Sequence, residues 1–100
     1  MIIPKSVRIG GVDYAIEYVE RLISSENTAL CGLINYDMAV IKIEPNVQDE
    51  QGKCRTLLHE IMHGIERHFK LDLPEDTVDN LANGLYMVIR DNPDMFKPAR

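Results

Sequence analysis

Cysteine is scarce in this sequence of 100 residues, and long apolar runs are missing from it. The two cysteines, Cys31 and Cys54, are too few for a disulfide scaffold and form no CxxC pair, so we expect two reduced thiols. The longest apolar run, residues 29–34, falls far short of the ~20 residues that cross a bilayer. Residues 1–6 lack the apolar segment of an export signal. These features predict a cytoplasmic protein with no membrane partner.

Basic residues are also in the minority. Eleven lysines and arginines face sixteen acidic residues, which gives a net charge of -5. Without a cationic field or a run of basic residues, direct binding to nucleic acid is not expected. The hydrophobic share of 45% and the charged share of 27% are ordinary for a globular protein. A chain of this length holds one small core, so residues 1–100 are expected to form a single domain.

The first half of the chain is patterned for strands. Gly10 and Gly11 separate residues 6–9 from a period-two segment, as a two-residue hairpin turn requires. A second hairpin is expected from residues 30–36 and 39–44. The sequence therefore predicts a small antiparallel sheet of two hairpins over about residues 6–44. The period-two segment shows its larger residues on one face at Val12, Tyr14, Ile16 and Tyr18.

The second half is patterned for helices. Apolar residues at spacings of three and four predict one helix over about residues 49–70 and another over about residues 74–91. Strands that are followed by two helices, each with an apolar stripe to bury, indicate an α+β fold with a small sheet and two packed helices. The first stripe consists of Cys54, Leu57, Leu58, Ile61, Met62, Ile65 and Phe69. The second consists of Val78, Leu81, Ala82, Leu85, Val88 and Ile89.

An HExxH motif occupies residues 59–63 of the first predicted helix. Four residues turn a helix by about 400°, so the rings of His59 and His63 stand one turn apart on nearly the same face and can reach one Zn²⁺. Glu60 lies beside them, placed to take a proton from a metal-bound water. We therefore predict one zinc ion per chain, with both histidines as ligands and Glu60 as the general base.

The third ligand is expected on the second helix, and two acidic residues compete for the role. If the helices fold back around residues 72 and 73, Asp79 lies about 5 Å along the axis from His63, and Glu75 lies about 10 Å away. Glu75 also has another explanation, because an acidic residue in a first turn complements the helix dipole. We therefore favour Asp79 and keep Glu75 as the alternative ligand.

Tyr86 lies seven residues after Asp79 and thus almost directly above it on the second helix. Its hydroxyl group could donate a hydrogen bond to a developing oxyanion, which makes Tyr86 a second catalytic candidate. The alternative is a tyrosine that closes the core with its hydroxyl group at the rim.

With these residues in place, the chain resembles the zincin-like metallopeptidases, and most of all the short ones encoded by phages and prophages. The resemblance covers about residues 29–96. It is carried by residues 32–36 (GLINY), 41–43 (IKI), 56–63 (TLLHEIMH), 78–86 (VDNLANGLY) and 90–93 (RDNP). In the related gluzincin group, an ExxxD pattern such as Glu75 to Asp79 supplies a Glu ligand and an Asp that supports a ligand histidine. On this point the resemblance and the axial spacing disagree.

The resemblance also implies an activity and a partner. It implies hydrolysis of a peptide bond in the cell interior, which is the host cytoplasm if a phage encodes the chain. It further implies a strand beside the active-site helix that pairs with an extended peptide or protein substrate, and residues 39–44 match that place. The alternative function is a zinc-stabilised protein-interaction module without turnover, which would need the ligands but not Glu60.

Overall fold

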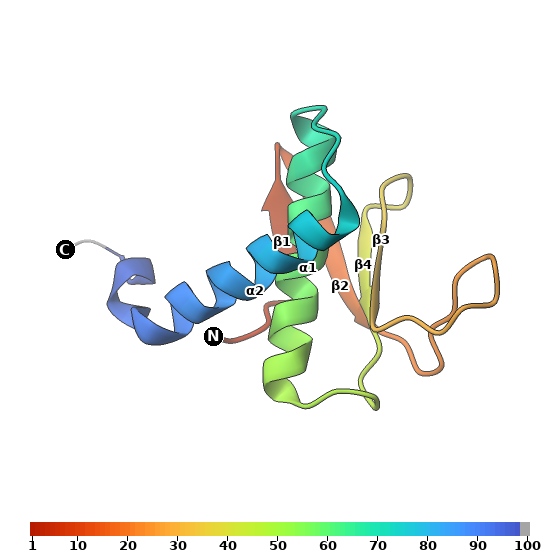
Figure 1. The fold of residues 1–100 in the computed structure, drawn as a ribbon, viewed down its shortest axis with the longest axis horizontal. Helices are drawn as coiled ribbons and strands as arrows, with labels where there is room; N and C mark the ends of the chain where they lie inside the picture. Colours follow the sequence, from red (N-terminus) through yellow and green to blue (C-terminus); the bar gives the residue numbers. More distant parts are fainter. Residues whose placement is uncertain (99–100) are drawn as a thin grey trace.

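The computed structural model describes residues 1–98 and shows four strands followed by two α-helices and a short 3₁₀-helix (Figure 1). This α+β arrangement of a small sheet and two packed helices confirms the predicted fold class. The elements in chain order are β1 (Ser6–Ile9), β2 (Val12–Tyr18), β3 (Gly32–Asn35), β4 (Val40–Ile43), α1 (Glu50–His68), α2 (Glu75–Asp91) and η1 (Pro93–Phe96).

Both predicted hairpins are present. β1 and β2 pair antiparallel around Gly10 and Gly11, whose φ angles of 57° and 84° are those that a tight two-residue turn demands and that glycine adopts without strain. β3 and β4 also pair antiparallel, with Ile34 opposite Ile41. The period-two segment, the double glycine and the two apolar runs at residues 30–36 and 39–44 therefore located all four strands.

The pairing between the two hairpins differs from the prediction, because β2 and β4 lie parallel and make the sheet mixed. The strand order is β1-β2-β4-β3. The connection from β2 carries the chain across the sheet to its far edge, so β3 forms outside and β4 folds back beside β2. Residues 39–44 consequently lie inside the sheet, and the free edge that they were expected to offer belongs to β3 instead.

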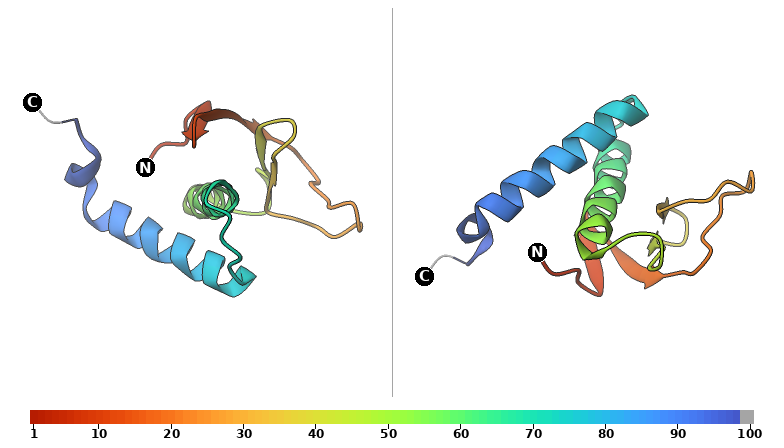
Figure 2. Two further views of the ribbon diagram at one scale, coloured as in Figure 1. Left: turned by 90° about the horizontal axis from the view of Figure 1, so that it is seen from above. Right: turned by 60° about the horizontal axis from the view of Figure 1, so that its bottom comes forward.

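The two helices form successive layers on one face of the sheet. Seen along its axis, α1 lies between the sheet and α2 (Figure 2). Ile41 and Ile43 of β4 are 0% exposed and pack with Leu57 on one side of α1. On the opposite side, a second cluster joins the helices through Cys54, Leu58, Ala82 and Tyr86. Since α1 is covered on two sides, the side chains on its remaining free face are held in a fixed direction.

The segment between β4 and α1 is organised by the carboxylate of Glu44, which is 3% exposed. Its Oε2 accepts hydrogen bonds from the backbone N–H groups of Asn46 (2.6 Å) and Val47 (2.8 Å), and its Oε1 accepts one from Arg21 (3.2 Å). Burial raises the pKa of Glu44, but these three donors outweigh it and leave the pKa below the ordinary 4.5. α1 then begins with Asp49 accepting from the N–H of Gly52.

Replacing Glu44 with Gln should lower the free energy of unfolding at neutral pH, because an amide NH₂ group cannot accept the hydrogen bonds that one carboxylate oxygen receives. Since the folded state lowers the pKa, the carboxylate's contribution is present above the unfolded pKa and is lost as the pH falls below 4.5. Urea unfolding at several pH values should therefore show a gap between parent and Glu44→Gln that closes on acidification. A gap that stays constant down to pH 3 would show that the charge of Glu44 contributes nothing.

Within residues 1–98, neither α-helix combines the length and the apolar composition needed to cross a lipid bilayer.

Candidate metal centre

His59 and His63 project from the same face of α1, one turn apart, as the HExxH spacing predicts. Their Nε2 atoms lie 3.2 Å apart, and the ring centroids are 4.9 Å apart with an angle of 68° between the ring planes. Both side chains are about one fifth exposed. Two imidazole nitrogens thus point at one position that solvent can reach.

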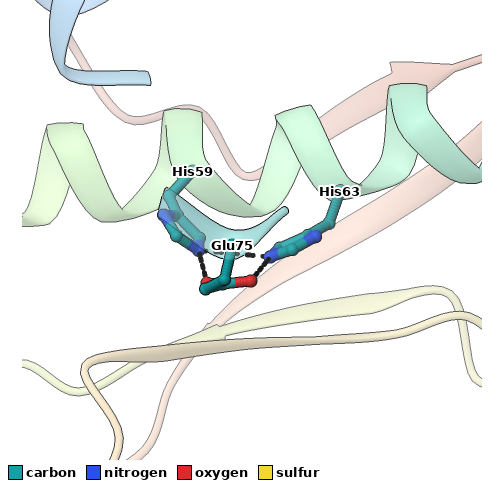
Figure 3. Close-up of side chains that lie close together, drawn as sticks. All are labelled: His59, His63 and Glu75. Atoms are coloured by element: carbon teal, nitrogen blue, oxygen red, sulfur yellow. Dashed lines mark hydrogen bonds and ion pairs between the residues drawn. The ribbon is translucent and has the colours of Figure 1, made fainter. Parts of the chain in front are cut away.

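Glu75, in the first turn of α2, completes the group (Figure 3). Its Oε1 lies 2.7 Å from Nε2 of His59, and its Oε2 lies 3.2 Å from Nε2 of His63. One potential ligand atom from each of the three residues lies within 4.8 Å of the others. His59, His63 and Glu75 therefore form a group that could hold a metal ion.

The favoured third ligand, Asp79, lies outside this group, and the alternative, Glu75, lies in it. The axial estimate assumed that α2 begins at the end of α1, but residues 71–74 form neither helix nor strand and run back along α1, where the N–H of Leu73 donates to Oε2 of Glu66 at 2.7 Å. Outside a helix the chain can advance by up to about 3.3 Å per residue, against about 1.5 Å in a helix. The first turn of α2, and not its second, therefore reaches His63.

Each histidine ring is held from behind by a carboxylate. Oδ1 of Asp79 lies 3.2 Å from Nδ1 of His59, and Oε1 of Glu66 lies 3.1 Å from Nδ1 of His63. If each Nδ1 donates its hydrogen bond to the neighbouring carboxylate, each neutral ring keeps a lone pair on Nε2. This carboxylate–histidine arrangement typically supports metal-binding histidines, because it fixes the tautomer and the ring orientation.

The consequence is a cluster of lone pairs. With Nδ1 protonated in both rings, the two Nε2 atoms and the carboxylate of Glu75 face one another as acceptors at 2.7 to 3.2 Å. Acceptors this close repel one another unless a cation or a proton lies between them. A cation bound among the three residues, or a proton on one of the Nε2 atoms, would relieve this repulsion.

Glu60 lies next to this group and is 7% exposed. Burial is the largest influence on its carboxyl group and raises its pKa above the ordinary 4.5, while the neighbouring histidines act in the opposite direction. The backbone of β3 approaches closely, because a Cβ atom on Gly32 would clash with Thr56 and would lie 3.2 Å from Oε2 of Glu60. Glu60 is thus a confined carboxylate with a proton affinity above that of a solvated one.

A cleft of about 620 Å³ opens over these residues, between α1, the start of α2 and the edge strand β3. Gly32, Leu33 and Ile34 of β3 line it, and β3 pairs only with β4, so its other edge is free in the described part of the chain. The cleft therefore combines the candidate metal group with an unpaired strand edge.

The predicted catalytic role of Tyr86 does not fit its position. The ring is 7% exposed and packs against Cys54, Leu58 and Ala82 in the core between the helices, and it does not line the cleft. Its neighbours Cys54, Arg55 and Leu58 belong to the N-terminal half of α1, before the histidines. Tyr86 is thus the core tyrosine of the alternative interpretation.

The tyrosine that does line the cleft is Tyr36, which follows β3. Its hydroxyl group donates a hydrogen bond to the backbone carbonyl of His63 at 3.2 Å, and the guanidinium of Arg67 lies 4.2 Å from its ring centroid. Burial raises the pKa of Tyr36 above 10.0, against the lowering effect of Arg67. Tyr36 therefore stays protonated and ties the end of the hairpin to the histidine turn.

Sequence reasoning missed two residues of this site, Glu66 and Tyr36. Glu66 carried a usable signal, because it stands three residues after His63 and thus on a neighbouring position of the helix surface. Its pKa is lowered mainly by the hydrogen bond from the N–H of Leu73 and next by His63. Tyr36 carried no such signal, since its distance from His63 depends on how the sheet packs against α1.

Comparison with protein-family models, with curated proteins and with solved structures found no match to this chain.

Proposed function

We propose that the protein is a zinc-dependent metallopeptidase of the cytoplasm that hydrolyses a peptide bond in an extended peptide or protein substrate. One observation carries the proposal. Nε2 of His59, Nε2 of His63 and the carboxylate of Glu75 converge beside the buried carboxylate of Glu60, in a cleft bordered by a free strand edge. A metal group, a general base and a place for an extended chain are what this reaction requires.

Zinc suits the donor set. Two imidazole nitrogens and one carboxylate oxygen are the ligands of many catalytic zinc sites, which leave a fourth position open. Ligand atoms about 2.0 to 2.1 Å from zinc in a tetrahedron lie about 3.3 Å from one another. The two Nε2 atoms lie 3.2 Å apart, and the two oxygens of Glu75 lie 2.7 Å from Nε2 of His59 and 3.2 Å from Nε2 of His63. One ligand atom from each residue lies within 4.8 Å of the others, so side-chain adjustments would accommodate the ion.

The residues of the chain have distinct tasks in this mechanism. Zinc held by His59, His63 and Glu75 would polarise the scissile carbonyl and acidify a coordinated water. Glu60 accepts the proton of the attacking water and passes it to the leaving amine, a role helped by the raised pKa of its buried carboxyl group. Asp79 and Glu66 hold the two imidazoles in the tautomer that offers Nε2 to the metal.

The alternative function is a zinc-stabilised interaction module without turnover. Such a module needs the ligands, but it gains nothing from Glu60, because burying a carboxylate costs free energy that an apolar side chain would not cost. The confinement of Glu60 at 7% exposure beside the histidines therefore favours catalysis.

The test of the proposed function is hydrolysis of a quenched fluorescent peptide mixture by protein loaded with one equivalent of zinc. Cleavage should disappear when the zinc is removed by a chelator and should return when zinc is added back. Cleavage that persists at full rate without metal, or no cleavage by protein shown to hold zinc, would contradict the proposal.

Replacing Glu75 and Asp79 one at a time shows which of the two acidic residues is the metal ligand. Glu75→Ala should lower zinc affinity more than Asp79→Ala, because Glu75 offers a ligand atom whereas Asp79 only supports His59. Loss of such a supporting carboxylate typically costs roughly 10- to 100-fold in metal affinity. Competition with a fluorescent chelator measures both variants. Retention of tight zinc binding by Glu75→Ala, with loss in Asp79→Ala, would return the ligand role to Asp79.

A further inference from the structure

Arg55 is the single lysine or arginine that lines the cleft within residues 1–98. It lies on α1 one turn before His59, and hence on the same face of the helix. The other charged groups that line the cleft are the carboxylates of Glu60, Glu75 and Asp79. One end of the cleft thus carries a fixed positive charge that the zinc mechanism does not use.

The guanidinium of Arg55 has no protein partner of opposite charge in the described part of the chain. No carboxylate lies within ion-pairing distance of it, whereas Arg8 pairs with Asp13 and Arg90 pairs with Asp91. An arginine side chain is always charged and offers five N–H donors in a fork that matches a carboxylate. A partly buried arginine with these donors free is equipped to bind an anionic group that enters the cleft.

The position of the Arg55 side chain is held by the core. Its guanidinium carbon lies 5.6 Å from the centroid of the Tyr86 ring, within the range of a cation–π contact. Tyr86 itself is buried between the helices, where it packs with Cys54, Leu58 and Ala82. Such a contact restrains the guanidinium without using its N–H donors. The side chain therefore loses little further conformational entropy when a ligand binds.

The distance between Arg55 and the metal group sets where the anionic group would sit. β3 runs along α1 in the same direction, since Gly32 lies beside Thr56 and Glu60, and the hydroxyl of Tyr36 reaches the carbonyl of His63. A substrate strand on the edge of β3 therefore also follows α1. Arg55 precedes the midpoint of the two histidines by about 9 Å of helix axis, which an extended chain covers in two to three residues.

We propose that Arg55 binds a carboxylate of the substrate peptide, two or three residues from the scissile bond and on one side of it. This inference rests on the proposed function and assigns to it a substrate class. The carboxylate belongs either to an aspartate or glutamate side chain or to the free C-terminus of the peptide. In the second case the protein releases short C-terminal fragments.

The experiment uses four pools of random decapeptides. They carry Glu or Gln at one fixed position and end in a free carboxylate or an amide. Cleavage sites are read by mass spectrometry with the zinc-loaded parent protein. Pools with a carboxylate at the stated distance from the cut should show a kcat/KM about tenfold higher than their neutral counterparts. A preference for Glu over Gln identifies a side-chain carboxylate as the group bound, whereas a preference for the free end over the amide identifies the C-terminal carboxylate.

Arg55→Gln should remove this preference and leave the rate on the neutral pools unchanged, whereas Arg55→Lys should retain part of it. Arg67→Gln is the matched control, because Arg67 also contacts a tyrosine ring but does not line the cleft. A loss of rate on all pools alike in Arg55→Gln would show a structural role and overturn the inference. So would a parent protein that cleaves acidic and neutral pools equally.

A binding measurement separates this inference from the proposed function. Fluorescence anisotropy with labelled pools and the zinc-loaded Glu60→Gln protein reports recognition without turnover. A carboxylate pool should bind about tenfold more tightly than its neutral counterpart, and the double variant Glu60→Gln/Arg55→Gln should lose this difference. That result supports the inference even if the parent protein hydrolyses nothing and the proposed function fails. Equal binding of all four pools overturns the inference, whatever the hydrolysis assay shows.

Discussion

Glu60→Gln should lower the rate of peptide hydrolysis by roughly 10² to 10⁴ while the zinc content stays at that of the parent protein. The amide keeps the size of the carboxylate but cannot accept the proton of the attacking water. Glu60 lies outside the His59, His63 and Glu75 group, so metal binding should not depend on its charge. The fall should appear in kcat, because the lost proton transfer belongs to the transition state and not to substrate binding.

The matched control for this variant is Glu50→Gln, which removes an exposed carboxylate from the same helix. It should leave both the rate and the zinc content unchanged. The decisive measurement is the steady-state rate of each variant together with its zinc content. If Glu60→Gln loses its zinc, then Glu60 is a ligand and the proposed division of roles must be abandoned. If Glu60→Gln hydrolyses peptide at the parent rate, another group is the base.

His59→Ala and His63→Ala should each abolish stoichiometric zinc binding and, with it, hydrolysis. Either change removes one of three protein ligands and leaves Glu75 facing a single imidazole. Binding to the folded state alone also stabilises it, by about 4.1 kcal/mol when free zinc exceeds Kd by 1,000-fold. Addition of zinc should therefore raise the Tm of the parent protein, whereas both variants should show no such rise.

His68→Ala provides the control for the histidine variants. His68 ends the same helix, is exposed and does not belong to the metal group. This variant should keep both the zinc content and the zinc-dependent rise in Tm. Full zinc retention in His59→Ala and His63→Ala, measured by thermal unfolding and metal analysis, would refute the assignment of both ligands.

Local sequence patterns were sufficient for the elements of this fold. The double glycine at residues 10 and 11 set one hairpin, and the spacing of apolar residues set α1 and α2. The HExxH spacing also brought His59 and His63 to one face, because helical geometry depends only on the chain between them. Each of these features is decided within a few residues, so the sequence could specify it.

The features that the sequence left open depend on the paths of the connections between elements. The parallel pairing of β2 with β4 follows from the path of the chain between the hairpins, which no periodicity encodes. The choice of Glu75 over Asp79 follows from the four non-helical residues before α2 and from the hydrogen bond of Leu73 to Glu66. The same displacement placed Tyr86 in the core. The path of one connection thus decided which residues of the second helix lie beside the histidines.

The most direct test of the account is the metal content of the full chain, purified without chelators and without nickel resin. Elemental analysis by mass spectrometry, combined with a protein concentration from amino-acid analysis, gives the molar ratio. We predict about one zinc per chain after dialysis against trace zinc, and a ratio near zero for His59→Ala treated in parallel. A parent ratio near zero, or equal ratios in the two proteins, would contradict the metal centre on which the proposed function depends.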